Sequence, residues 1–289
     1  MTSPTLFVAG AGGKFGRRVV ELLLERGYAG KIIAGSRKPE ELKFAGVETR
    51  KADFTDEAGF TAALRGVDRL LLISTDALGE PRRAQHLTAI AAAKAAGVKR
   101  IVYTSMPHPE PGNIIPMALD HYATEQAIKA TGIEYTILRN SWYTENLLQA
   151  LPPALASGKW YSASGQGRIS HVTRDDTARA AAGALLSDHA GNRVFTVTGR
   201  EAFTNAEIAA IATEVLGKPI DVVDVPDAGY TEGLKQAGLP APVAELLTTF
   251  EIGQRHGILS MVTDAVEELW GTPAMTVREF LVANRATLT

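Results

Sequence analysis

LFVAGAGGKFG, residues 6–16, places four apolar residues directly before a run of small residues. Short, continuously apolar runs are typical of strands buried on both faces of a parallel sheet. Glycine lets the chain turn sharply and brings backbone N–H groups against a pyrophosphate at the positive end of the next helix. A glycine turn that only joins a strand to a helix is the alternative, but the position at the first βα junction favours a cofactor. We therefore predict a dinucleotide-binding loop made of Gly10, Ala11, Gly12, Gly13, Lys14, Phe15 and Gly16.

The first half of the chain alternates short apolar runs with longer helical patterns, which indicates a parallel sheet wrapped by helices. The expected strands are residues 6–9, 31–34, 47–50, 70–73, 100–103, 135–138 and 194–197. The expected helices are residues 15–26, 57–64, 82–96, 118–131, 174–186 and 205–216. The predicted fold class is α/β, a Rossmann-type parallel sheet with helices on both faces and a smaller C-terminal substrate-binding region.

The regular alternation is lost after residue 138, where Pro152-Pro153 and nearby glycines predict a loop-rich stretch. We divide the chain into an NAD(P)-binding Rossmann domain, residues 1–150, and a smaller substrate-binding region, residues 151–289. Some segments of the second region are expected to return to the core. The remainder is expected to be helical and to supply the outer wall of the substrate cleft.

The composition excludes several classes of protein. The chain has 289 residues and a formal charge of −2, which gives no broad attraction for nucleic acid or anionic membranes. It has no cysteine, so disulfides, thiolate nucleophiles and Cys-ligated metals are excluded. The sequence shows neither a signal peptide pattern nor an apolar stretch of membrane-spanning length. We expect a cytoplasmic protein without a metal, with a small-molecule partner, whose state as a monomer or homo-oligomer is open.

The end of the second strand predicts which nicotinamide cofactor is bound. NAD-specific sites place an acid there for the ribose 2′-hydroxyl, about 20 residues after the loop, but here residues 34–38 contain no acid and the next one along the chain is Glu40. Arg37 can pair with a 2′-phosphate through its guanidinium fork, and Ser36 can donate a hydrogen bond. The alternative is that Arg37 is an ordinary surface cation. We therefore predict NADP(H), preferred over NAD(H).

Polar residues after the third and fourth strands are further candidates for the cofactor site. Ligands of open parallel sheets lie outside the carboxyl ends of the strands. Asp53 follows the third strand and is expected near adenine, whereas Ser74 and Thr75 follow the fourth and are expected near the middle of the cofactor.

An acid–base pair common in this class of enzyme is missing. Many short-chain dehydrogenases protonate a developing alkoxide with a Tyr-x-x-x-Lys pair on the helix after the fifth strand. No tyrosine of this chain has a lysine four residues later; Tyr122, for example, is followed by Gln126. Sugar epimerases and alcohol dehydrogenases of that type are therefore disfavoured.

Seven blocks of sequence carry a resemblance to a known family: residues 10–16, 34–37, 51–54, 70–74, 91–99, 103–105 and 137–146. On these blocks the chain resembles the NmrA-like atypical short-chain dehydrogenases, and within them the bacterial NAD(P)H:quinone oxidoreductases of type 2, over essentially its whole length. Similar blocks occur in bacterial triphenylmethane dye reductases. The resemblance implies a nicotinamide cofactor more directly than it implies one substrate.

The resemblance also implies roles for residues around the nicotinamide. Phe54, Ser105 and Asn140 are expected to contact the cofactor. Met106, Trp142, Tyr143 and Asn146 are expected to line the acceptor pocket, with Asn140 and Asn146 as candidate donors to a quinone oxygen, although Trp142 and Tyr143 suit core packing equally well on residue type alone.

His121 takes the place that holds a catalytic lysine in isoflavone reductase relatives, and it is the candidate catalytic residue. Its spacing of four from Glu125, and of Glu125 from Lys129, also fits an ordinary charged ladder on one helical face, which we favour.

The predicted function is hydride transfer from NADPH to a quinone or a similar flat conjugated acceptor. A quinone gains aromaticity on reduction, so proximity, orientation and hydrogen bonds replace the missing acid–base pair. Two alternatives stay open: a non-catalytic NADP(H) sensor of the NmrA type, and a reductase of triarylmethane dyes.

Overall fold

The computed structural model describes residues 3–288, and within them a seven-stranded sheet has every strand parallel to its neighbours. In spatial order the strands are β3 (Glu48–Lys51), β2 (Ile32–Ser36), β1 (Leu6–Ala9), β4 (Arg69–Leu72), β5 (Arg100–Ser105), β6 (Glu134–Asn140) and β8 (Arg193–Val197). The order reverses between β1 and β4, and all the carboxyl ends lie at one edge of the sheet, hereafter the carboxyl edge. The Rossmann-type fold class is confirmed.

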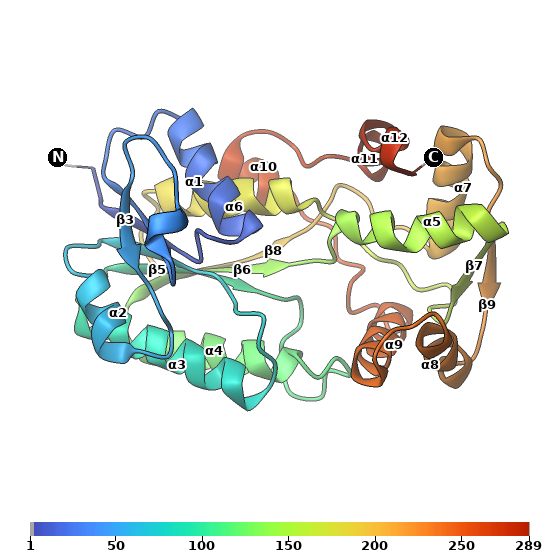
Figure 1. Ribbon diagram of the computed structural model, residues 1–289, viewed down its shortest axis with the longest axis horizontal. Helices are drawn as coiled ribbons and strands as arrows, with labels where there is room; N and C mark the ends of the chain where they lie inside the picture. Colours follow the sequence, from blue (N-terminus) through green and yellow to red (C-terminus); the bar gives the residue numbers. More distant parts are fainter. Residues whose placement is uncertain (1–2, 289) are drawn as a thin grey trace.

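Helices cover both faces of the sheet (Figure 1). One face carries α1 (Lys14–Glu25), α6 (Arg174–Leu186) and α10 (Ala265–Trp270), and the other carries α2 (Glu57–Ala63), α3 (Glu80–Ala95) and α4 (Ala118–Ala130). Along β1, Leu6 and Val8 join the core under the first layer, while Phe7 and Ala9 join the core under the second. Burial on both sides explains why this strand is apolar at every position.

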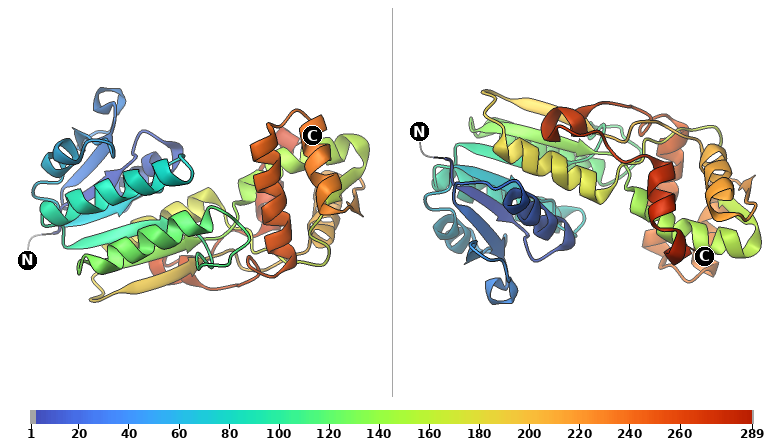
Figure 2. Two further views of the ribbon diagram at one scale, coloured as in Figure 1. Left: turned by 90° about the horizontal axis from the view of Figure 1, so that it is seen from below. Right: turned by 90° about the horizontal axis from the view of Figure 1, so that it is seen from above.

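The rest of the described chain forms a smaller body at the end of the molecule opposite the N-terminus (Figure 2). It contains the short helix η2 (Thr144–Asn146), α5 (Leu147–Ser157), β7 (Lys159–Ser162), α7 (Asn205–Leu216), β9 (Asp221–Asp224), α8 (Asp227–Gln236), α9 (Ala241–Arg255), α11 (Val277–Ala283) and α12 (Arg285–Leu288). The strands β7 and β9 pair in parallel. The other short helix, η1 (Pro39–Glu41), follows β2.

Three segments return from this body to the sheet. The strand β8 pairs with β6, α6 packs beside α1, and α10 packs against α6 and β8. The small residues of α6 permit close packing, because Ala178, Ala181 and Ala182 are fully buried and a Cβ added at Gly183 would lie 2.1 Å from the backbone oxygen of Leu269. The predicted helix over 174–186 is therefore present with the same bounds.

The loop-rich stretch expected around Pro152-Pro153 is wrong for residues 147–157. These residues form α5, which has both prolines inside it. The prolines remove two helical hydrogen bonds, but Leu147, Leu151 and Leu155 bury the apolar face of α5 in the core of the smaller body. The burial of these leucines outweighs the tendency of the two prolines to break a helix. The strand β9 was likewise not expected in a region predicted to be helical.

None of the helices in residues 3–288 combines the length and the apolar character needed to cross a membrane.

Candidate active site

The glycine loop after β1 has a backbone shape that only small residues permit. Gly10 has a φ of +77°, and its carbonyl accepts a hydrogen bond from the N–H of Gly13 at 3.0 Å. A Cβ added at Gly16 would lie 2.4 Å from the Gly10 oxygen. The helix α1 starts at Lys14 without a side-chain cap or an acid in its first turn. Its first N–H groups are therefore available to an anion, and the cradle fits a pyrophosphate.

The end of β2 lies beside this loop and presents an unpaired arginine. A Cβ added at Gly12 would lie 2.9 Å from Ser36 Oγ, so these segments are in close contact. Arg37 is exposed and forms no ion pair or hydrogen bond with residues 3–288. The neighbouring Lys38 is instead paired with Glu41 at 2.8 Å. The geometry therefore leaves Arg37 free to meet a phosphate group.

Asp53 and Phe54 follow β3. Asp53 Oδ1 accepts hydrogen bonds from the N–H and the hydroxyl of Thr55, at 2.9 and 2.7 Å, which hold the pKa of the carboxyl below its usual range. Phe54 packs against Phe60 with 5.1 Å between ring centroids. The carboxylate of Asp53 is thus ionised and fixed in place, whereas Phe54 contributes to the core beneath it.

The segment after β4 is held by other elements. The N–H of Ser74 donates to Thr104 Oγ1 at 2.9 Å. The N–H of Thr75 donates to His86 Nε2 at 3.1 Å, and its carbonyl accepts from Arg82 Nε and Nη2 at 3.1 and 2.7 Å. Because His86 and Arg82 both belong to α3, this helix fixes the peptide of Thr75 at the carboxyl edge. Nothing in the local sequence pattern predicted these two residues.

His121 is not part of the charged ladder that its spacing suggested. Its side chain is buried, with Nδ1 2.8 Å from the hydroxyl of Tyr103. Burial, together with the nearby charge of Arg82, lowers the pKa of His121 far below its ordinary value. The ladder is limited to Glu125 and Lys129, 3.5 Å apart. The imidazole is therefore neutral and cannot be the positive member of such a ladder.

The carboxyl ends of β5 and β6 bring further predicted residues together. The hydroxyl of Ser105 donates to the buried Glu125 at 2.7 Å. Met106 is buried against Ile115. Asn140 is 7% exposed, and within the described chain its amide atoms have no partner in good hydrogen-bond geometry, although the amide lies close enough to the hydroxyl of Tyr143 to lower the pKa of that group. A buried amide whose hydrogen bonds are incomplete is costly in a folded protein, so Asn140 is a candidate to bind a ligand at this edge.

Aromatic side chains follow β6. The ring of Trp142 lies 4.3 Å from that of Phe250 in α9, measured between centroids. The guanidinium of Arg174 lies 5.0 Å from the ring centroid of Tyr143. Trp142 is thus part of the contact between the sheet and the smaller body, and Tyr143 is covered by an exposed cation. Asn146 lies in η2, half-buried, one turn further along.

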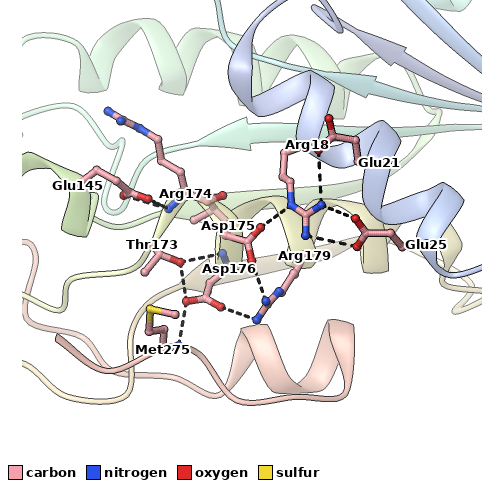
Figure 3. A network of polar contacts seen from close by, with 11 residues as sticks. Arg18, Glu21, Glu25, Glu145, Thr173, Arg174, Asp175, Asp176, Arg179 and Met275 are labelled. Carbon is pink, nitrogen blue, oxygen red and sulfur yellow. Dashed lines mark hydrogen bonds and ion pairs between the residues drawn. The ribbon is translucent and has the colours of Figure 1, made fainter. Parts of the chain in front are cut away.

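A polar network fixes the N-terminus of α6 against α1 (Figure 3). Arg18 of α1 donates to Asp175 at 2.6 Å. The buried carboxylate of Asp176 accepts from the hydroxyl of Thr173 at 2.7 Å and from the N–H of Met275 at 2.9 Å. The network therefore connects the helix of the glycine loop, α6 and the segment that leads to α11.

Three buried histidines predict a steep loss of stability in mild acid. Burial lowers the pKa of His86 to about 3 and of His171 to about 4, and that of His121 far below its ordinary value. In the unfolded chain each histidine would have a pKa of about 6.5. Below about pH 6.5 the unfolded state binds protons at these histidines and the folded state does not. Their contribution to the free energy of unfolding is therefore complete above about pH 6.5 and is lost as the pH falls.

Each proton contributes about 1.4 kcal/mol per pH unit, so we expect the free energy of unfolding to fall by about 4 kcal/mol between pH 6 and pH 5. Urea denaturation at half-unit steps measures this slope. His86→Gln, whose amide can replace both ring hydrogen bonds, should reduce the slope by about one third. A free energy that is flat over this range would contradict the prediction.

The parallel sheet, the uncapped glycine loop and the free arginine beside it fit an NAD(P)-binding protein of the Rossmann class. The chain belongs to the family described as NAD(P)H-binding, whose model matches residues 10–188. It is 38% identical to quinone oxidoreductase 2 of Escherichia coli, over 94% of this chain and 96% of that protein.

Two solved structures are similar to this chain over almost its whole length. The structure of the NADPH-dependent quinone oxidoreductase of Escherichia coli in complex with NADPH is 37% identical, with a TM-score of 0.91 over 96% of this chain and 99% of that one. The triphenylmethane reductase of Citrobacter sp. in complex with NADP(H) is 33% identical, with a TM-score of 0.89 over 97% and 99% of the two chains. The resemblance to the quinone oxidoreductases of type 2 is confirmed.

Proposed function

We propose that this chain is an NADPH-dependent reductase of quinones or similar flat conjugated acceptors. When bound, NADPH supplies the hydride. The observation that carries the proposal is the buried amide of Asn140, whose only neighbouring polar group named among the described residues is the hydroxyl of Tyr143, and which lies at the same carboxyl edge as the glycine loop and Arg37. In support, relatives that match this chain over almost their whole length are named as quinone and triphenylmethane reductases.

The residues of the first half of the sheet bind the cofactor in this proposal. The N–H groups of the glycine loop hold the pyrophosphate, and Arg37 with Ser36 holds the 2′-phosphate, which gives the preference for NADPH over NADH. Asp53 meets the adenine, and the Ser74-Thr75 segment supports the middle of the nucleotide. The division into residues 1–150 for the nucleotide and 151–289 for the acceptor follows the same proposal.

The residues after β5 and β6 receive the acceptor. Trp142 and Tyr143 offer flat apolar area for a ring, with Met106 and Asn146 beside them. The amide N–H of Asn140 is available to an acceptor oxygen that gains negative charge. His121 is uncharged and already hydrogen-bonded to Tyr103, so we assign it to the support of Tyr103 and not to proton transfer.

We expect the purified protein to oxidise NADPH when benzoquinones or naphthoquinones are added, without a bound flavin. NADPH deuterated at the transferred position should give a primary isotope effect on single-turnover reduction, because the C–H bond breaks in that step. The loss of NADPH absorbance measures both the steady-state oxidation and the single-turnover rate.

Two outcomes would favour the alternatives. Turnover with triarylmethane dyes and none with quinones would indicate a dye reductase. Nucleotide binding by calorimetry without turnover of any acceptor would indicate an NADP(H) sensor. A cytoplasmic location and a possible homo-oligomer are expectations of the same proposal, which gel filtration and cell fractionation can check.

A further inference from the structure

Glu125 is a fully buried carboxylate on α4, placed between the carboxyl ends of β5 and β6. Its Oε1 accepts from Ser105 Oγ at 2.7 Å and from Arg139 Nε at 3.0 Å. Its Oε2 accepts from Arg139 Nη2 at 2.8 Å and from Lys129 Nζ at 3.5 Å. Each carboxylate oxygen therefore faces two donors.

This arrangement determines where the proton of Ser105 lies. The two-point pairing with Arg139 favours the ionised carboxylate of Glu125. An ionised carboxylate has no proton to give and about four positions at which it accepts hydrogen bonds, and here donors occupy them all. The bond between Ser105 and Glu125 must therefore use the only proton of the serine hydroxyl. Towards any other group Ser105 can act only as an acceptor.

We propose that Glu125 is a positioning residue that makes Ser105 an obligate hydrogen-bond acceptor, and that Ser105 thereby recognises an N–H or O–H donor of the nicotinamide half of the cofactor. This inference rests on the proposed function and on the expectation from the family resemblance that Ser105, at the end of β5, contacts the cofactor. Two donors have the required chemistry, the carboxamide NH₂ of the nicotinamide and a hydroxyl of its ribose.

The same reasoning excludes the electron acceptor as the partner of Ser105. A quinone oxygen accepts hydrogen bonds and gains negative charge on reduction, so it would repel a hydroxyl oxygen that has no proton to offer. The two sides of the site then have opposite polarity. Ser105 offers lone pairs on the face covered by α4, whereas Asn140, on the face covered by α1 and α6, has an N–H to donate.

Two variants and a nucleotide analogue test the proposal. Calorimetry measures Kd for NADP⁺ and for its 3-acetylpyridine analogue, which lacks the carboxamide NH₂. Ser105→Ala should weaken NADP⁺ about 5-fold, the loss of one ordinary hydrogen bond, and should leave the analogue unaffected if the carboxamide is the donor. Equal weakening of both nucleotides supports the same acceptor role with the ribose hydroxyl as the donor.

Glu125→Gln tests the positioning role. Arg139 would retain the amide oxygen of the new side chain, so its NH₂ would donate to Ser105 and release the serine proton towards the cofactor. We expect about the same 5-fold loss as in Ser105→Ala, and no further loss in the double variant, because both changes remove one acceptor. Glu232→Gln, an exposed change in α8, is the matched control and should leave Kd unchanged.

Several results would overturn the inference. Ser105→Ala with the Kd of the unchanged protein would do so, as would a fully additive double variant. Thermal unfolding of each variant checks the fold, and if Glu125→Gln does not fold, the analogue comparison with Ser105→Ala still decides. Failure of the unchanged protein to bind any nicotinamide nucleotide would instead contradict the proposed function.

Discussion

Gly16→Ala should weaken NADPH binding by about 100-fold, since it removes two or more charge-assisted hydrogen bonds from the pyrophosphate. The added Cβ would lie 2.4 Å from the Gly10 oxygen and 2.9 Å from the Cα of Ala11. Both contacts are with backbone, which cannot rotate away as a side chain would. The loop and the start of α1 must therefore separate, and the N–H groups that face the phosphates move with them.

Fluorescence titration with NADPH measures the expected loss. Gly233→Ala is the matched control, because a Cβ added at Gly233 in α8 meets no atom within 4 Å. That control should bind NADPH normally and unfold at the same or a slightly higher temperature. If Gly16→Ala bound NADPH as the unchanged protein does, the glycine loop would not be the pyrophosphate site.

Arg37→Gln should lower kcat/KM for NADPH by about 30-fold, a typical value for one lost arginine–phosphate hydrogen-bonded pair. The value for NADH should stay within about 2-fold, because the ribose of NADH lacks the phosphate that the guanidinium would hold. The effect is expected from Arg37 and not from Lys38, since Lys38 is already paired with Glu41.

Steady-state rates with NADPH and with NADH, measured with one quinone, give the ratio of the two kcat/KM values. Lys38→Gln removes the same charge one residue away and should change the ratio by less than about 3-fold, as expected for an exposed, paired cation. Equal losses in the two variants would show that only general positive charge matters. An unchanged ratio in Arg37→Gln would remove the basis for preferring NADPH.

Much of the sheet could be predicted because strands that are buried on both faces appear in the sequence as short apolar runs. Strands such as β1 and β4 are apolar at nearly every position, so they were clear in the sequence, whereas the edge strand β3 consists of the polar residues 48–51 and was recognised only from its place in the alternation. The topology then placed Asp53, Ser74, Ser105 and Asn140 at one edge without any knowledge of their contacts, because the carboxyl ends of parallel strands meet there.

The predictions that failed concern contacts between segments that are far apart in the sequence. The helix α5 forms across Pro152-Pro153 because its leucines meet the core of the smaller body, which no local propensity reveals. Glu125 shows the same limit: spacings of four on a helix are typical of solvated charges, and only the position of Arg139 on β6 makes a buried carboxylate favourable. The charged ladder expected to include His121 failed for the same reason, because the histidine is buried beside Tyr103.

The return of α6 and β8 to the sheet has a consequence for synthesis of the chain. Translation releases the N-terminal residues first, so α1 emerges long before the helix that covers it. Val19 and Leu23 of α1 belong to the same core as Ala178 and Ala182 of α6. This layer of the core therefore stays incomplete until Ala182 has left the ribosome, so the N-terminal half cannot bury the whole apolar face of α1 by itself.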